Sequence, residues 1–260
     1  MTYCVALQLD RGLLFMSDTR TNSGVDNIST FRKMVHFEVP GERCITLMTA
    51  GNLATTQAVV SLLQERSKSP DERSPDILQL PTMFQVAGLI GQTLREVIAQ
   101  HDDNGQKASS TFSATILLGG QIAGGEPRIY LIYPEGNFIE ASADTPFFQI
   151  GETKYGRPIL VRAYEAGMSF EEAMKLILVS FDSTIKANLS VALPLDYHVY
   201  ETGSLRLGKT GRIEQDDPYY QEISSGWGVA LREAFAALPE FRFDDSASAP
   251  APDTVTGPTG

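Results

Sequence analysis

Cysteine, histidine and tryptophan are scarce in this chain of 260 residues, which has 2, 3 and 1 of them, respectively. Two cysteines do not make a disulfide framework, and Cys4 and Cys44 lie in apolar segments typical of buried thiols in a reducing cytoplasm. Neither Cys-x-x-Cys nor His-x-x-x-His spacing occurs. The sequence therefore argues against a secreted disulfide scaffold and predicts no zinc site.

Basic residues and long apolar runs are also lacking. The 21 lysines and arginines are outnumbered by 32 aspartates and glutamates, so the net charge is −11, which disfavours nucleic acid and anionic membranes as partners. No apolar run is long enough to cross a bilayer, and the first residues, MTYCVALQLDRG, lack the basic region and cleavage site of a signal peptide. We expect a cytoplasmic protein that binds neither nucleic acid nor membrane.

The two ends of the chain differ in composition. Residues 244–260 contain Asp, Ala, Ser, Pro, Thr and Gly with one apolar Val255. Such a segment cannot bury enough apolar surface to offset its ordering entropy, so a disordered acidic tail is predicted there. Residues 1–243 are predicted to form one folded domain.

The hydrophobic periodicity predicts an α+β fold. Apolar residues alternate over residues 3–9, and the turn at residues 10–12 indicates a hairpin with a second strand at 13–17. Strands and helices do not alternate one to one afterwards, which favours antiparallel sheets with helices on their faces. We therefore predict a four-layer αββα sandwich of two sheets between two helical layers. Further strands are expected at 34–39, 43–49, 112–118, 128–133, 138–141 and 197–207, a loop at 19–30, and helices at 53–63, 83–97, 169–187 and 219–238.

Thr2 is the most informative residue for function. A small residue after Met1 usually allows removal of the initiator methionine, which leaves the Thr2 α-amine free beside its own hydroxyl. An α-amine has a pKa of about 7.7–8.0, so its neutral fraction near pH 7 accepts the hydroxyl proton. This is how an N-terminal threonine nucleophile is activated. A Met-Thr start is common, however, and by itself it seldom has a catalytic meaning.

Asp18 and Lys33 are predicted to lie beside Thr2. The hairpin turn folds Asp18, at the end of the second strand, back next to Thr2, and Lys33 begins the following strand. A lysine lowers the pKa of a nearby hydroxyl and stabilises negative charge, while a carboxylate keeps that lysine charged and oriented. Taken singly, each is more often a strand-end carboxylate or a surface lysine.

Several motifs resemble those of proteasome β-subunits, which are N-terminal-nucleophile hydrolases. More narrowly, residues 1–34 resemble the Anbu family of bacterial proteasome-like peptidases, and the resemblance extends over roughly residues 1–240. The αββα fold of these proteins agrees with the predicted element order. The matching pieces are Thr2, Ser17-Asp18-Thr19-Arg20, Lys33, Met48-Thr49-Ala50-Gly51 and Gly167-Met168-Ser169-Phe170-Glu171-Glu172-Ala173.

The resemblance implies a catalytic role for four positions. Thr2 is the nucleophile, its α-amine is the general base, and Asp18 and Lys33 form the supporting pair. The amide of Gly51 is the oxyanion donor, at the end of a strand and the start of a helix, where free N–H groups and the positive end of the helix dipole point.

The resemblance also implies residues that hold the substrate. Arg20, Thr21 and Asn22 on one side and Thr49 on the other flank the site, as partners of an extended peptide held by backbone hydrogen bonds. Thr49 is small and uncharged, so no strong preference for charged side chains is expected near it.

The chain departs from the β-subunit pattern where that pattern supports the nucleophile. The usual Gly-Ser-Gly segment is replaced by Gly151-Glu152-Thr153, which has no serine. The usual late Asp-x-x-Ser is replaced by Asn188-Leu189-Ser190. We take Ser190 as the supporting residue, with Asn188 and Asp182 as alternatives.

The sequence thus predicts a threonine-type hydrolase that cleaves peptide or other amide bonds through an acyl-enzyme, without a metal or organic cofactor. Its subunits are expected to form a homo-oligomeric ring or open helical assembly and to need only removal of Met1 for activation. Two alternatives stay open. One is a weakly active or non-catalytic assembly subunit, and the other is an amidase on a small or isopeptide substrate. The natural substrate and any partner that delivers it are not identified.

Overall fold

The computed structural model of the protein describes residues 2–22, 28–69, 75–102 and 112–243. The chain divides into two units, Met1–Ser224 and Ser225–Gly260. The tail predicted at 244–260 lies outside the described residues, so it stays a prediction. The first unit carries the sheets and the predicted site, and the last helix, α6 (Pro218–Ala236), crosses the division between the units.

One antiparallel sheet contains the N-terminus. The hairpin predicted at residues 3–17 is confirmed, with Cys4 opposite Ser17 and Leu9 opposite Gly12. Tyr3 lies opposite Gly151 on the other side, and Asp18 lies opposite Leu195. The strand order is β10-β1-β2-β11-β12. The strands are β1 (Tyr3–Leu9), β2 (Gly12–Asp18), β10 (Phe147–Gly151), β11 (Leu195–Glu201) and β12 (Lys209–Ile213).

A second five-stranded sheet is also antiparallel and has the order β5-β6-β7-β8-β9. Its strands are β5 (Met34–Val39), β6 (Arg43–Gly51), β7 (Ala114–Ile122), β8 (Arg128–Ile132) and β9 (Phe138–Glu140). A short ribbon of β3 (Arg20–Asn22) and β4 (Ile28–Thr30) lies in the segment predicted to be a loop. That prediction was wrong for these six residues, because three-residue strands are too short to show a period.

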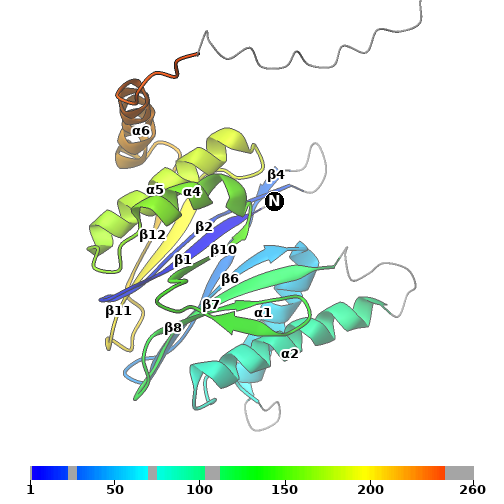
Figure 1. The fold of residues 1–260 in the computed structure, drawn as a ribbon. Coiled ribbons are helices and arrows are strands. Elements are labelled where there is room, and N and C mark those ends of the chain that lie inside the picture. Colours follow the sequence, from blue (N-terminus) through cyan, green and yellow to red (C-terminus); the bar gives the residue numbers. More distant parts are fainter. Residues whose placement is uncertain (1, 23–27, 70–74, 103–111, 244–260) are drawn as a thin grey trace, which may run out of the picture. The chain divides into compact units, whose positions relative to one another are not determined.

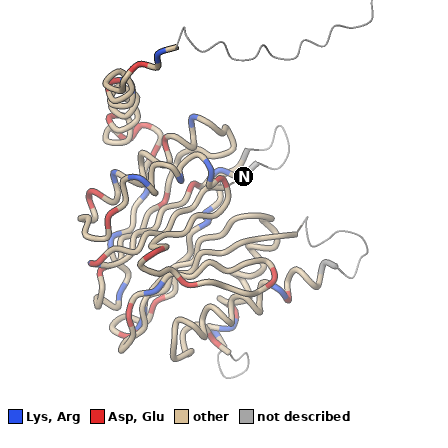
Figure 2. Tube along the Cα trace, viewed as in Figure 1, with Lys and Arg blue, Asp and Glu red and all other residues tan. Residues whose placement is uncertain are grey.

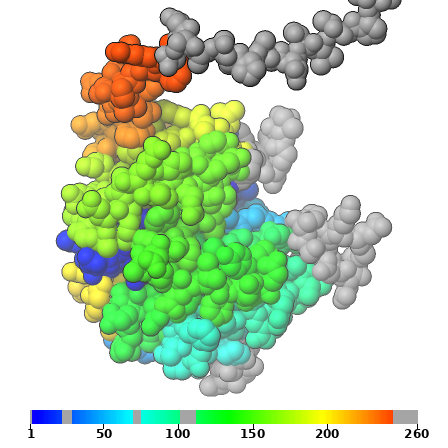
Figure 3. Space-filling model, viewed as in Figure 1, coloured from blue at the N-terminus to red at the C-terminus, as the bar shows by residue number. Residues whose placement is uncertain are grey.

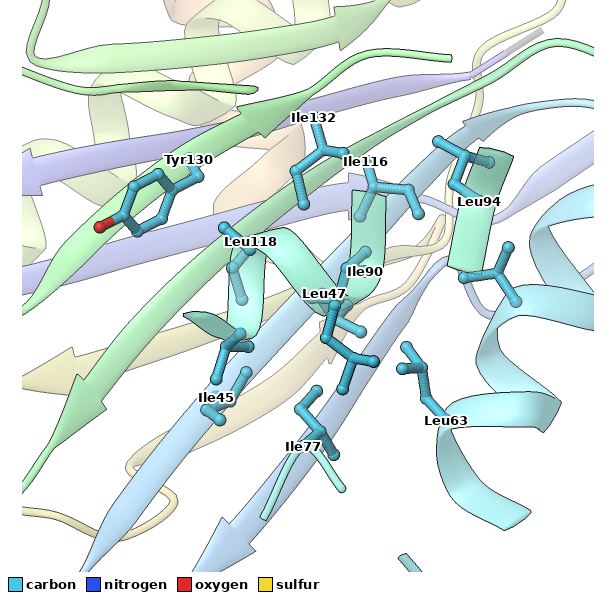
Figure 4. Packing of buried hydrophobic residues seen from close by; sticks show 14 of the residues in the cluster. Ile45, Leu47, Leu63, Ile77, Ile90, Leu94, Ile116, Leu118, Tyr130 and Ile132 are labelled. Carbon is cyan, nitrogen blue, oxygen red and sulfur yellow. The ribbon is translucent and has the colours of Figure 1, made fainter. Parts of the chain in front are cut away.

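Two helices cover each sheet, which gives the four layers of the αββα sandwich in the first unit (Figure 1). Helices α1 (Leu53–Lys68) and α2 (Met83–Asp102) pack on the second sheet, where Leu47, Leu118 and Ile132 meet Leu63 and Ile90 (Figure 4). Helices α4 (Thr153–Ala163) and α5 (Phe170–Ala187) pack on the first sheet.

Strand β1 shows how alternation specifies the layers. Tyr3, Val5 and Leu7 belong to the core under α4 and α5, whereas Cys4 and Ala6 belong to the core between the sheets. Both faces of the strand are buried, so its side chains serve two cores at once. In Figure 3 the blue N-terminal strands are largely covered by later parts of the chain.

Helix α4 and strands β10 and β12 were not predicted. The sequence of α4, TKYGRPILVRA, contains Gly156 and Pro158, which normally disfavour a helix interior. Pro158 is the sixth of the eleven residues of α4, so it removes one intrahelical hydrogen bond, and packing of Leu160 in the core between the first sheet and its helices compensates for the weak propensity. The predicted strand at 197–207 is shorter in the structure, where β11 ends at Glu201 and the chain turns back as β12.

Charged residues lie mainly on the helices and connections, while most of the strand trace is uncharged (Figure 2). Among the described residues, no helix combines the length and apolar character needed to cross a membrane.

Candidate active site

Thr2 is held by the backbone that follows β10. Only 7% of Thr2 is exposed, and its carbonyl oxygen accepts a hydrogen bond from the Glu152 N–H at 2.7 Å. Gly151 has φ +83°, and a Cβ at this position would lie 1.8 Å from the Thr2 carbonyl oxygen. Only glycine therefore fits here. The segment that lacks the expected serine still holds Thr2, through its backbone.

Asp18 and Lys33 form a buried ion pair next to β1. The Lys33 ammonium donates to Asp18 Oδ1 at 2.7 Å and to the Arg20 carbonyl at 2.7 Å. Asp18 Oδ1 also accepts the Tyr3 N–H at 2.9 Å, so the pair is tied to the residue that follows Thr2. The exposed fractions are 0% for Asp18 and 6% for Lys33, which places both groups away from bulk water.

Burial and charge act in opposite directions on Asp18. Burial raises the pKa of its carboxyl above the ordinary value, and the Lys33 ammonium counteracts this effect. Removing either partner would leave an uncompensated buried charge, so the two side chains hold each other in place. Within the described part of the chain, Asp18 Oδ2 has no hydrogen-bond partner.

Gly51 ends β6 just before α1. Its φ is +116°, and a Cβ would lie 2.4 Å from the Ser113 carbonyl oxygen, so glycine is required at this turn as well. The next residue, Asn52, caps α1 by accepting the Thr55 N–H at 3.1 Å. A cleft of about 770 Å³ is lined by Thr2, Lys33 and Gly51 together. The structure thus brings together the residues predicted from three separate stretches of sequence.

The predicted substrate-binding residues surround this cleft in part. Thr21 and Thr49 line it, and the Thr49 N–H donates to the Lys33 carbonyl at 3.0 Å. Arg20 contributes its carbonyl to Lys33. Asn22 is described only as a residue of β3, opposite Ile28.

The predicted supporting residues lie at the end of α5. The Ser190 N–H donates to Asn188 Oδ1 at 2.9 Å, in a loop tied to the site because Thr19 Oγ1 donates to the Pro194 carbonyl at 2.8 Å. Asp182 instead accepts from Lys186 at 3.0 Å and from the Tyr220 hydroxyl at 3.3 Å. None of the three contacts Thr2 through a hydrogen bond between described residues, so the role of Ser190 stays a prediction.

A buried network under Tyr3 was missed by the sequence analysis. The Tyr3 hydroxyl lies 2.7 Å from Ser180 Oγ and accepts from Gln149 Nε2 at 2.5 Å, and Ser180 donates to the Gly156 carbonyl at 3.1 Å. Burial raises the pKa of Tyr3 to about 12, so the hydroxyl stays protonated. The network fastens the residue next to Thr2 to α4, α5 and β10. A tyrosine in an otherwise aliphatic strand was the one available signal.

Among the described residues, no cluster of three His, Cys, Asp or Glu side chains could hold an ion. The free cysteines, Cys4 and Cys44, are both buried.

Known proteins are similar to this chain in both sequence and structure. A family model described as "Proteasome subunit" matches residues 2–191. The structure of Anbu (ancestral beta-subunit) from Yersinia bercovieri has 48% identity and a TM-score of 0.87, covering 94% of this chain and 100% of that one. This chain belongs to the Anbu family of proteasome subunits.

Two further Anbu structures match equally well. Anbu from Hyphomicrobium sp. strain MC1 has 46% identity and a TM-score of 0.85, with 93% of this chain and 100% of that one covered. A helical assembly of the Anbu complex from Pseudomonas aeruginosa has 47% identity and a TM-score of 0.86, with 93% and 98% covered. A search of curated proteins gave no match. The Anbu structures bear out the predicted α+β fold of the N-terminal-nucleophile type.

Proposed function

We propose that this protein is a threonine-type N-terminal-nucleophile hydrolase that cleaves peptide or other amide bonds. The observation that carries the proposal is the buried Asp18–Lys33 pair, joined at 2.7 Å and tied to the Tyr3 N–H beside Thr2. A buried ion pair is costly to keep away from water, and it adds little stability over apolar packing. A catalytic role next to a hydroxyl gives it a chemical reason.

The reaction follows from the groups around Thr2. After removal of Met1, the neutral α-amine accepts the proton of the Thr2 hydroxyl, whose oxygen bonds to the amide carbon of the substrate. The Gly51 N–H, at the start of α1, stabilises the oxyanion, and Lys33 stabilises the developing negative charge. The proton passes to the leaving amine as the C–N bond breaks. Water then hydrolyses the ester and restores the hydroxyl. Ser190 supports the nucleophile from the end of α5.

The substrate is an extended peptide in the cleft. Thr21 of β3 and Thr49 of β6 lie on the cleft lining, so their backbones are available as strand partners, with Arg20 and Asn22 in the same short strand as Thr21. The relative from Pseudomonas aeruginosa is a helical assembly. By analogy, we propose that this chain forms a homo-oligomer of the same kind, in a reducing cytoplasm that suits its two free cysteines.

A second candidate is a non-catalytic assembly subunit with the same fold. The specific observation in its favour is that Gly151, Glu152 and Thr153 stand where β-subunits have a serine, so this segment offers no serine hydroxyl to Thr2. An amidase acting on a small or isopeptide substrate would share the chemistry of the first candidate, and only its substrate would differ.

Intact mass and hydrolysis measured together test the proposal. The protein is made without an N-terminal tag, and we expect loss of Met1 together with hydrolysis of a mixed pool of fluorogenic peptides. Thr2→Ala should lower that hydrolysis by about 100-fold or more, because the nucleophile is gone. Sedimentation should show the same assembly state for both proteins.

The control is Thr202→Ala, the same substitution at an exposed threonine outside the cleft. It should leave the hydrolysis unchanged. Retention of Met1, or activity that survives in Thr2→Ala, contradicts the proposed nucleophile. A protein without Met1 that assembles but hydrolyses nothing supports the second candidate.

A further inference from the structure

The cleft that contains Thr2 carries an uneven charge. Arg32 and Lys33 line it, and no Asp or Glu is among its described lining residues. Lys33 is paired with the buried Asp18, so its charge is largely compensated. Arg32 is exposed, and no ion pair joins it to another described residue. Arg32 also borders a second cavity with Asp196, but that carboxylate is paired with Arg212, so among the described residues the Arg32 guanidinium is the cleft charge without an ion-pair partner.

The N-terminus of helix α1 adds to the positive potential in this cleft. Its first residues, Leu53 and Ala54, and its cap Asn52 line the cleft, so the positive end of the helix dipole lies there. Acidic side chains in a first turn normally compensate this end, but α1 has none. The remaining lining residues bring no charged side chain; they are Thr2, Thr21, Val35, Thr49, Ala50, Gly51, Thr56, Gln57, Val60 and Ser61.

This local charge runs against that of the whole chain. With a net charge of −11, the protein repels anions in general. The cleft nevertheless contains Arg32 and the N-terminus of α1, neither of which is neutralised by a described acidic residue of the cleft. Its positive potential therefore favours the binding of anionic groups.

We propose that the cleft selects peptides that carry a carboxylate side chain at the residue before the scissile bond, with Arg32 as the specificity-determining residue. The proposal rests on the peptide-cleaving function proposed above. A guanidinium recognises a carboxylate through two parallel hydrogen bonds, which an amide of the same size reproduces only in part. Glu and Gln at one peptide position therefore differ mainly in the contact to Arg32.

The test measures peptide binding without turnover. Thr2→Ala protein is titrated with three labelled peptides of one sequence that differ only by Glu, Gln or Lys at the residue before the bond, and anisotropy gives each Kd. We expect the Glu peptide to bind about tenfold more tightly than the Gln peptide, and the Lys peptide most weakly. The difference should shrink in high salt. In the double variant with Arg32→Gln, the Glu and Gln peptides should bind within about twofold of each other.

The matched control is Arg206→Gln in the same background, which removes an exposed arginine that lines a different cavity. It should keep the tenfold difference. Equal binding of the Glu and Gln peptides, a preference that survives Arg32→Gln, or no binding of any peptide overturns the proposal.

Hydrolysis by the protein with Thr2 intact separates this proposal from the proposed function. If the Glu peptide binds preferentially but none of the three is cleaved, the hydrolase function fails while the selectivity stands. If all three peptides bind and are cleaved equally well, the function stands and the role of Arg32 is wrong.

Discussion

At the scale of single residues, Gly151 and Glu152 fix the position of the Thr2 carbonyl group. Gly151 touches the Thr2 carbonyl so closely that any Cβ would overlap it, and the neighbouring Glu152 N–H fixes that carbonyl at 2.7 Å. Below the strand, Asp18 and Lys33 are joined to the Tyr3 N–H. The nucleophile that we propose at Thr2 needs this kind of support, because an error of about 1 Å in its position costs a large part of the rate.

Gly151→Ala tests this support at the scale of one methyl group. The new Cβ would lie 1.8 Å from the Thr2 carbonyl oxygen, so Thr2 must shift and hydrolysis should be largely lost. We expect the free energy of unfolding to fall by about 1–3 kcal/mol as well, measured by urea denaturation. Gly203→Ala is the control, since Gly203 has φ +78° but a Cβ there would meet nothing within 4 Å. Equal effects of the two substitutions would contradict the proposed contact.

At the scale of elements, helix α5 packs against β1 and contacts the side chain of Tyr3. Phe181 packs against the Tyr3 ring with a centroid distance of 4.5 Å, and Ser180 contacts the Tyr3 hydroxyl. The helix begins with a full capping box, in which Ser169 accepts from the Glu172 N–H and Glu172 accepts from the Ser169 N–H. Local sequence therefore determines where the element that supports the site begins.

Ser169→Ala should lower the free energy of unfolding by about 1 kcal/mol, because the first turn of α5 loses its cap. Urea denaturation measures the change. Ser183→Ala, the same substitution inside the same helix, should have almost no effect, since alanine suits a helix interior. If both variants unfold at the same urea concentration, the cap does not stabilise the protein.

At the scale of the first unit, a polar contact around His198 joins the two sheets through the core between them. Thr46 of β6 lies 2.9 Å from His198 Nδ1 on β11 and 3.1 Å from His36 Nδ1 on β5. His198 Nε2 accepts the Gly208 N–H at 3.3 Å, which assigns the ring proton to Nδ1. Burial lowers the pKa of His198 to about 3 and also lowers that of His36, so both rings are neutral in the folded protein.

The free energy of unfolding should therefore decrease as the pH is lowered from about 6.5 toward 3. In the unfolded chain, His198 is protonated below about pH 6.5, whereas in the folded chain it is protonated only near pH 3. Between these values the unfolded state binds more protons, so lowering the pH costs up to about 1.4 kcal/mol per pH unit from this group. Urea denaturation at several pH values measures the slope. His198→Gln should show a shallower slope than the unchanged protein, and parallel slopes would contradict the assignment.

Site residues that lie close together along the chain could be predicted from the sequence, whereas distant ones could not. Thr2, Asp18 and Lys33 could be brought together from sequence because one hairpin links the first two and Lys33 lies directly before β5. The Tyr3 network could not, since Gln149, Gly156 and Ser180 lie more than a hundred residues away along the chain. The position of Arg32 on the cleft lining could not be predicted either, because the cleft is formed by elements that local pattern does not pair.

Local pattern, by itself, predicted the αββα fold, the β1–β2 hairpin and the start of α5, and it placed Asp18 and Lys33 beside Thr2. These features depend on periodicity, turns and caps, which act over a few residues. Tertiary structure alone decided that GETKYGRPILVRA would turn at Gly151 and continue as a helix, and that β12 would join the first sheet. Packing against Tyr3 and pairing with β11 override the weak propensities of those segments, and no local signal carries that information.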